Sequence, residues 1–179
     1  MKTVLISIGL LLPVMLWASS EALEKTLLRD VEKWVQNSNY ELVLVETPEA
    51  GTQGGKYYKV NLSGQVKGFL YTGRVNTVRS ASARSGQNAS SEYFDYYILY
   101  DSDLTVQKVK VLRYKATHGQ MISAPSWLKQ FQGYKPGQPL EPGRQVDGIS
   151  GATISVNNIT FDIRKNTSIL RNLVRKTNP

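Results

Sequence analysis

The 179-residue sequence contains no cysteine and only one histidine, His118. The missing cysteine excludes thiolate zinc sites, iron–sulfur ligation, thiol redox chemistry and a cysteine nucleophile. A single histidine excludes a multi-histidine metal site, and a Ser–His–Asp triad would have to use His118. The whole sequence is 41% hydrophobic and 20% charged, which is typical of a single globular domain rather than low-complexity disorder. Many common enzyme classes are therefore excluded.

Acidic residues are scarce relative to basic ones, with 14 Asp and Glu against 22 Lys and Arg, a net charge of +8. Such an excess can attract nucleic acid, an anionic membrane or an acidic partner. The basic residues are scattered along the chain, and no dense basic block or known nucleic-acid-binding motif is present. We therefore expect a generally basic surface and no nucleic-acid partner.

The N-terminus resembles a targeting segment. Lys2 precedes an uncharged run over residues 3–18, and small residues follow at Ala18-Ser19-Ser20. This pattern predicts a signal peptide over residues 1–22, cleaved after Ala22 or after Ala18. The run is slightly shorter than the roughly 20 apolar residues of a bilayer span, and an uncleaved membrane anchor is the alternative. Either way the domain over residues 23–179 is expected to be exported, to the periplasm or the extracytoplasmic face of the cytoplasmic membrane.

Hydrophobic periodicity and turn residues predict an α+β fold: an antiparallel sheet built from two hairpins, with N-terminal and C-terminal helices packed against one face. The helices are expected over 21–37, 126–131 and 153–175. The hairpins are expected over 57–75 and 93–114, with a strand or connector at 40–46 and loops at 48–55, 79–91 and 133–143.

The segment from Asp147 to Ser155 is a turn rich in glycine and hydroxyl groups that leads directly into the last helix. Gly148 and Gly151 permit backbone turns and close approach of a bulky group. Amides at a helix start bind phosphate readily, and Thr153 would place its hydroxyl beside such a group. Arg144 is the nearest cation in sequence. The alternative is an ordinary helix N-cap.

The residues Ser150-Gly151-Ala152-Thr153, following Asp147, resemble the flavinylation motif of the FMN-binding domain family. That family includes the G subunit of Rnf complexes, the C subunit of sodium-pumping NADH:quinone reductase and small exported proteins. In it, a flavin transferase uses magnesium and FAD to place FMN on the motif threonine as a phosphoester. The resemblance implies FMN attached covalently to Thr153, with Asp147 as part of the transferase's recognition motif.

Other segments match the family in the same order, so the resemblance covers roughly residues 57–175. Gly68 to Tyr71 is similar to a Gly-Tyr segment, Ala116-Thr117-His118-Gly119 to a Glu-Thr-x-Gly turn, and Ser126 to Phe131 to a Ser-Trp-x-x-Gln-Phe helix. Ala116 departs from the usual acid. The candidate cofactor-binding residues are Asp147, Ser150, Gly151, Ala152, Thr153, Thr117 and Gly119. His118 is either near the flavin or a turn residue, and Trp127 and Phe131 either stack on the flavin or pack in the core.

These observations predict an exported electron carrier rather than a stand-alone enzyme, since a flavin performs the redox chemistry and the protein positions it. Its expected partners are the flavin transferase and membrane or extracytoplasmic redox proteins, and no metal site or catalytic residue is expected in the chain itself. One alternative is a non-redox exported module whose basic surface binds anionic polymers or membrane. Another is a hydrolase that uses Ser150 or Thr153, for which His118 would be the only candidate base.

Overall fold

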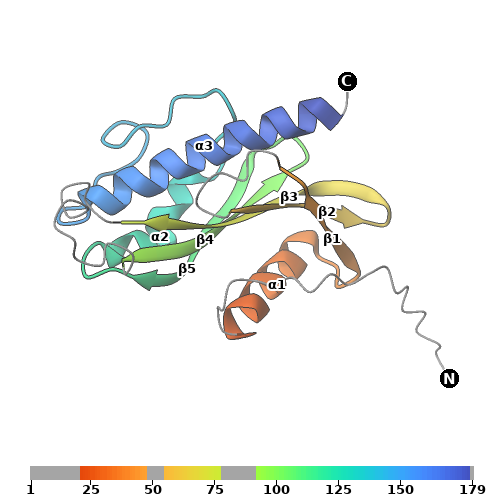
Figure 1. Cartoon of the computed structure of the whole chain (residues 1–179), viewed down its shortest axis with the longest axis horizontal. Helices are drawn as coiled ribbons and strands as arrows, with labels where there is room; N and C mark the ends of the chain where they lie inside the picture. The colour runs from red at the N-terminus through yellow and green to blue at the C-terminus, as the bar shows by residue number, and fades with distance from the viewer. Residues whose placement is uncertain (1–20, 48–54, 78–91, 178–179) are drawn as a thin grey trace.

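The computed structural model describes residues 21–47, 55–77 and 92–177 (Figure 1). Residues 1–20 of the leader expected over 1–22, the loop over 79–91 and nearly all of the loop over 48–55 lie outside these residues. The helices are α1 (Glu21–Val35), η2 (Gln120–Ser123), α2 (Pro125–Leu128), η3 (Lys129–Phe131) and α3 (Thr153–Thr177). The strands are β1 (Tyr40–Val45), β2 (Lys56–Leu62), β3 (Gln65–Asn76), β4 (Tyr93–Asp101) and β5 (Val106–Lys115). In the described part of the chain, no helix has the length and hydrophobicity needed to span a bilayer.

The strands form one antiparallel sheet in sequence order, β1-β2-β3-β4-β5. Both expected hairpins are confirmed, as β2–β3 and β4–β5. The first closes through Ser63 and Gly64, which both have positive φ, at 52° and 77°, as a two-residue hairpin turn with the right twist requires. Residues 40–45, for which the sequence left two interpretations, form the edge strand β1 on β2. The sheet therefore has one strand more than two hairpins supply.

The two long helices lie on opposite faces of the sheet, so the expectation that they share one face is wrong (Figure 1). Leu27 and Val31 of α1 pack with Tyr97 and Leu99 of β4 on one face. On the other face, α3 packs on the remaining inward-facing residues of the same strand, Tyr96, Ile98 and Tyr100. The whole run from Tyr96 to Tyr100 is buried, as it is in a strand that is covered on both sides.

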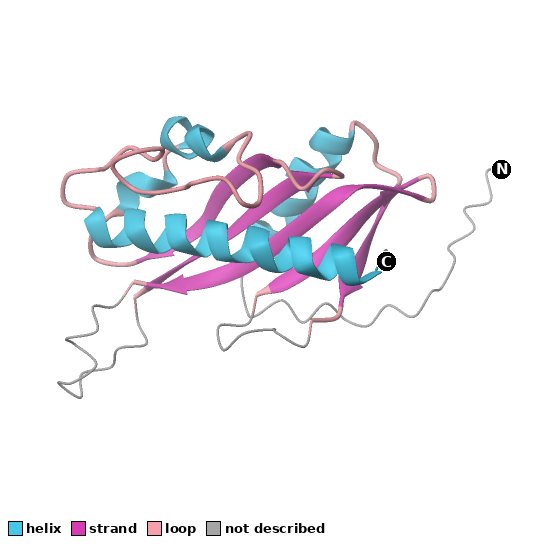
Figure 2. Cartoon of the chain, turned by 90° about the horizontal axis from the view of Figure 1, so that it is seen from above, coloured by secondary structure: helices cyan, strands magenta, loops and turns pink. Residues whose placement is uncertain are grey.

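α3 runs lengthwise across the sheet (Figure 2), and buried hydrogen bonds fix its position. The Tyr96 hydroxyl donates to Asp162 at 2.6 Å and the Tyr57 hydroxyl donates to Asn166 at 2.6 Å. Burial raises the pKa of Asp162, and the hydrogen bond from Tyr96 opposes that shift. Because unmatched polar groups here would be costly, these pairs specify one register of α3 on the sheet. That register determines where the N-terminus of α3 lies.

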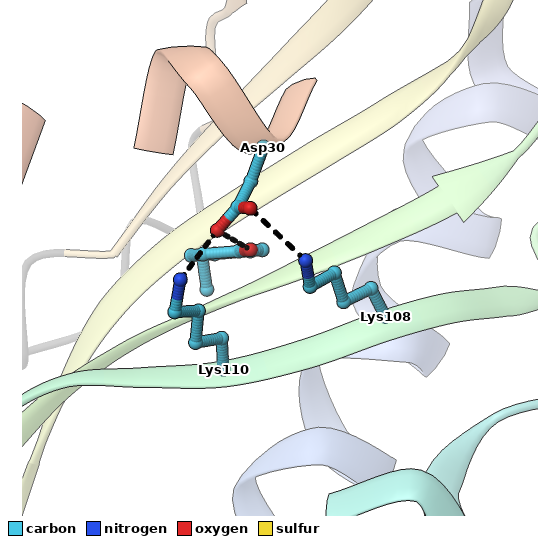
Figure 3. A network of polar contacts seen from close by, with 4 residues as sticks. Asp30, Lys108 and Lys110 are labelled. Carbon is cyan, nitrogen blue, oxygen red and sulfur yellow. Dashed lines mark hydrogen bonds and ion pairs between the residues drawn. The ribbon is translucent and has the colours of Figure 1, made fainter. Parts of the chain in front are cut away.

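α1 is joined to the opposite face by a charged cluster around Asp30 (Figure 3). Its carboxylate accepts hydrogen bonds from Lys110 Nζ at 2.6 Å, Tyr97 Oη at 2.8 Å and Lys108 Nζ at 3.1 Å. Burial alone would raise the pKa of Asp30, but these donors outweigh it and lower the pKa to about 2. The ionised form of Asp30 is therefore the one that holds α1 to β4 and β5.

Candidate functional site

The turn over residues 147–152 leads into α3, and its hydrogen bonds show at which residue the helix begins. Gly151 has φ of 76°, a conformation that residues with a side chain rarely adopt. The next amide, of Ala152, donates to the Ile149 carbonyl at 3.0 Å. The Val156 amide then donates to the Ala152 carbonyl at 2.9 Å, the first hydrogen bond of the helix. Ala152, which is buried, is therefore the N-cap of α3, and Thr153 is the first residue inside the helix.

An alanine at this position leaves the helix start without a side-chain cap. N-cap residues are usually Ser, Thr, Asp or Asn, whose oxygen accepts from the second or third amide of the helix. Ala152 has no such oxygen, and the first turn of α3 contains no acidic residue. The positive end of the helix dipole is thus not neutralised by a cap or an acid of its own turn. The ordinary N-cap interpretation of Thr153 is wrong, and its exposed side chain stands beside amides that suit an anion.

The short helix region over residues 125–131 contacts the turn at Asp147. The Trp127 indole N–H donates to the Asp147 carbonyl at 3.0 Å, and the Asp147 amide donates to Gln130 Oε1 at 2.6 Å. Phe131 is fully buried and Trp127 packs edge-to-face on it, with ring centroids 5.4 Å apart. The Ser-Trp-x-x-Gln-Phe and Asp-Gly segments therefore form one unit. Phe131 is a core residue, Trp127 is half-buried beside the turn, and Gln130 is a contact that the sequence analysis did not single out.

The turn over residues 116–119 lies against the first turn of α3. Gly119 has φ of 91°, and a Cβ at this position would lie 2.5 Å from Ser155 Oγ and 2.8 Å from Tyr114 Oη. Tyr114 donates its hydroxyl proton to the His118 carbonyl at 2.5 Å, so the Ser155 hydroxyl, 2.8 Å away, donates to Tyr114. Gly119 is therefore required both for its backbone conformation and for this close approach.

Thr117 is hydrogen-bonded to the carboxylate of Glu92, a residue that the sequence did not single out. Its amide donates to Glu92 at 3.1 Å, and its hydroxyl also donates to Glu92. The hydrogen bonds from Thr117 hold the pKa of Glu92 below its usual value. Glu92 thus supplies a carboxylate to the turn in which Ala116 lacks one. The Thr117 hydroxyl supports this turn and is not free to meet a ligand as a donor.

The remaining candidates are exposed. The side chains of Asp147, Ser150 and His118 face solvent, and no hydrogen bond between described residues joins His118 to Ser150 or Thr153. This arrangement does not favour the hydrolase alternative. Arg144, expected to add positive charge beside a phosphate, instead forms an ion pair with Glu141 at 3.1 Å. Within residues 21–47, 55–77 and 92–177, no group of three or more His, Asp or Glu residues could hold a metal ion.

The residues at this end of α3 fit the phosphate end of FMN. The uncapped amides of the first helical turn supply donors, Thr153 supplies an exposed hydroxyl, and the open space beside Gly151 leaves the approach free. Gln130 Nε2 is buried and has no hydrogen-bond partner among the described residues, although Gln130 Oε1 contacts the Asp147 amide. A buried donor without an acceptor indicates a site that can accept a further polar group.

Comparison with known proteins agrees with this geometry. Residues 91–165 match the family model of the FMN-binding domain. The match spans β4, β5, the short helices and the first half of α3, and it includes every candidate cofactor-binding residue. No curated protein matches the chain. The match over residues 91–165 confirms the resemblance to the FMN-binding domain family that the residues around Thr153 carry.

Proposed function

We propose that the protein is an exported electron carrier that holds FMN covalently through a phosphoester on Thr153. One observation supports the attachment point above the others. The Thr153 side chain is exposed on the first residue of a helix whose N-cap is alanine. A phosphodiester at this point would be stabilised by the helix dipole, by about 0.3–1 kcal/mol at an exposed site.

The attachment reaction balances with FAD as the donor and a flavin transferase with magnesium as the catalyst. Thr153 Oγ forms a bond to the phosphorus of the FMN half, the phosphoanhydride bond of FAD breaks, and AMP leaves. The proton of the Thr153 hydroxyl is released to solvent. The chain's own contribution is to present the hydroxyl on a rigid helix start, which the hydrogen bonds of Trp127 and Gln130 to Asp147 position.

Two features support an electron-carrying role: the sequence has no dinucleotide-binding fingerprint, and the candidate site is exposed to solvent. FMN supplies both one-electron and two-electron chemistry when it is bound. The sequence contains no Gly-x-Gly-x-x-Gly dinucleotide fingerprint. Asp147, Ser150 and Thr153 are exposed, so a partner protein can approach closely. Covalent attachment would also keep the cofactor from diffusing away outside the cytoplasm.

Intact-mass measurement tests the attachment point. After co-expression with a flavin transferase, the protein should be yellow and heavier by one FMN less one water. Thr153→Ala should abolish the increment, whereas Thr153→Ser should retain part of it because the hydroxyl remains. Ser150→Ala is the matched control, since it removes a neighbouring exposed hydroxyl and should leave labelling intact. Labelling of Thr153→Ala, or loss of labelling only in Ser150→Ala, would move the acceptor elsewhere.

A further inference from the structure

A second cluster of hydrogen-bond donors lies far along α3 from Thr153, where the loop after η3 passes over the helix. Gly137 in this loop has φ of 96°, and a Cβ there would lie 3.3 Å from Arg171 Nη1. The loop is anchored to the sheet because the Val106 amide donates to the Tyr134 carbonyl at 2.9 Å and the Gly133 amide donates to the Val106 carbonyl at 2.8 Å. Loop and helix are therefore held in contact around Arg171.

Tyr134 brings a buried hydroxyl into this cluster. Only 6% of the residue is exposed, and Tyr134 Oη has no hydrogen-bond partner in the described part of the chain. Leaving such a group buried and unpaired is unfavourable. The backbone hydrogen bond from Val106 to the Tyr134 carbonyl holds this residue against β5, with its phenol buried.

Arg171 also has a buried donor, its Nε, without a hydrogen-bond partner among the described residues. Arg164 lies seven positions earlier in α3, on the same side of the helix and about 10 Å away along its axis. No described carboxylate forms an ion pair with either arginine, because Glu141 pairs with Arg144 and Asp162 is bound by Tyr96 beneath the helix.

The charges of both arginines reach the Tyr134 phenol. Burial raises the pKa of Tyr134, and Arg164 and Arg171 act in the opposite direction. The cluster thus combines one phenolic O–H and two guanidinium groups, all of them donors. Arg164 also lies over the Phe161 ring, 5.7 Å from its centroid, and among the described residues no acceptor is hydrogen-bonded to Tyr134 Oη or Arg171 Nε. Guanidinium groups pair in forked geometry with the oxygens of phosphate or carboxylate, and phosphate offers more acceptor oxygens.

We propose that Tyr134, Arg164 and Arg171 form a binding site for a phosphate group, separate from the flavin attachment point. Arg164 and Arg171 are 11 and 18 residues beyond Thr153 in α3, or about 16 and 27 Å along the helix. The phosphate group comes either from a small soluble phosphate or from a phospholipid headgroup. This site does not depend on the proposed electron-carrying function, because none of its residues contacts the turn at Asp147.

The test uses the full-length chain expressed without flavin transferase, so that FMN attachment has no part in the result. Calorimetric titration with inorganic phosphate, at constant ionic strength, measures the soluble source. Co-sedimentation with vesicles of phosphatidylglycerol, compared with phosphatidylcholine, measures the lipid source. Binding in the first assay supports a soluble phosphate ligand, and binding only to phosphatidylglycerol vesicles supports a lipid headgroup.

Three variants distinguish a built site from general attraction of anions to a basic helix. Arg171→Gln and Tyr134→Phe should weaken binding at least about tenfold, because each removes a donor to the phosphate. Arg175→Gln is the matched control: it removes the same charge from an exposed residue of the same helix and should change affinity less than about twofold. Equal effects of Arg171→Gln and Arg175→Gln would overturn the proposal.

Tyr134→Phe also provides a readout that does not depend on ligand. Removing an unpaired buried hydroxyl should raise the melting temperature without phosphate, while the phosphate-dependent increase seen in the unaltered protein should disappear. Non-specific stabilisation by phosphate salt would instead be the same in every variant. Absence of binding to both phosphate and vesicles would refute the site. A lower melting temperature of Tyr134→Phe without phosphate would show that the hydroxyl already has a partner in the unliganded protein, and would refute the site as well.

Discussion

Replacing Gly119 with alanine should destabilise the protein through two separable effects. The first is backbone strain, because φ at this position is 91°. The second is steric, because the new Cβ would lie 2.5 Å from Ser155 Oγ and 2.8 Å from Tyr114 Oη. Gly143→Ala isolates the first effect, since Gly143 also has positive φ, at 77°, and a Cβ there would meet no atom within 4 Å beyond its chain neighbours.

The magnitude follows from these contacts. Positive φ in a residue other than glycine costs about 1–2 kcal/mol, which both variants should lose. Gly119→Ala must also displace Ser155 from Tyr114, which costs about 1 kcal/mol for the hydrogen bond and about 1–3 kcal/mol for the crowding. We therefore expect a loss of about 3–6 kcal/mol in Gly119→Ala and about 1–2 kcal/mol in Gly143→Ala.

Urea unfolding followed by tryptophan fluorescence measures both losses in the protein without flavin. The slope of the free energy against urea should be unchanged, so that the difference in midpoint reports stability. Flavin labelling of folded Gly119→Ala should also decrease, because the turn at 116–119 and the first turn of α3 would move apart. Equal losses in the two variants would refute the close packing of Gly119 on Ser155 and Tyr114.

The remaining predictions concern the recognition acid, the charged cluster and topology. Asp147→Asn should leave the melting temperature within a few degrees while it impairs FMN attachment, because the hydrogen bonds of Asp147 to other described residues involve its backbone alone; normal labelling would exclude the acid from recognition. The pKa of Asp30 is lowered to about 2, so its contribution to stability is present above pH 4 and is lost as the pH falls towards 2. Asp30→Asn should therefore be less stable than the unaltered protein at pH 7, and acid titration of unfolding should show the gap narrowing below pH 4; a constant gap would contradict the role of the carboxylate. Alkaline phosphatase fused after Pro179 should be active, because the domain is expected to be exported. The N-terminal sequence of the purified protein should begin near Leu23 if the leader is cleaved and at Met1 if it is an anchor. Activity of a reporter that folds only in the cytoplasm, fused at the same place, would reverse this topology.

The sequence determined the elements and the family because both are local properties. Alternating residues and the Ser63-Gly64 turn predicted the first hairpin, and residues at helical spacing predicted α1 and α3. The motif ending at Thr153 identified the FMN-binding domain, and its position at the start of α3 followed from the glycine before it. Each of these signals is contained in a short stretch of chain.

The tertiary structure decided the face on which each helix lies. The apolar run from Tyr96 to Tyr100 is compatible with one covered face or two, and only the packing of Leu27 and Val31 against one side and α3 against the other resolves it. A strand directs alternate residues to opposite faces, but its sequence does not say which helix covers which face.

Long-range contacts also completed the candidate flavin site and created the cluster at Arg171. Glu92 binds Thr117, Gln130 binds Asp147, and the loop at Gly137 approaches Arg171. In each case the two partners are far apart in the sequence and belong to different segments of the fold. Local periodicity carries no information about such pairs, because their distances depend on how α3 and the short helices pack on the sheet. The sequence therefore determined which cofactor to expect and on which residue, whereas the packing of α3 determined which side chains surround that residue and which donors remain without an acceptor.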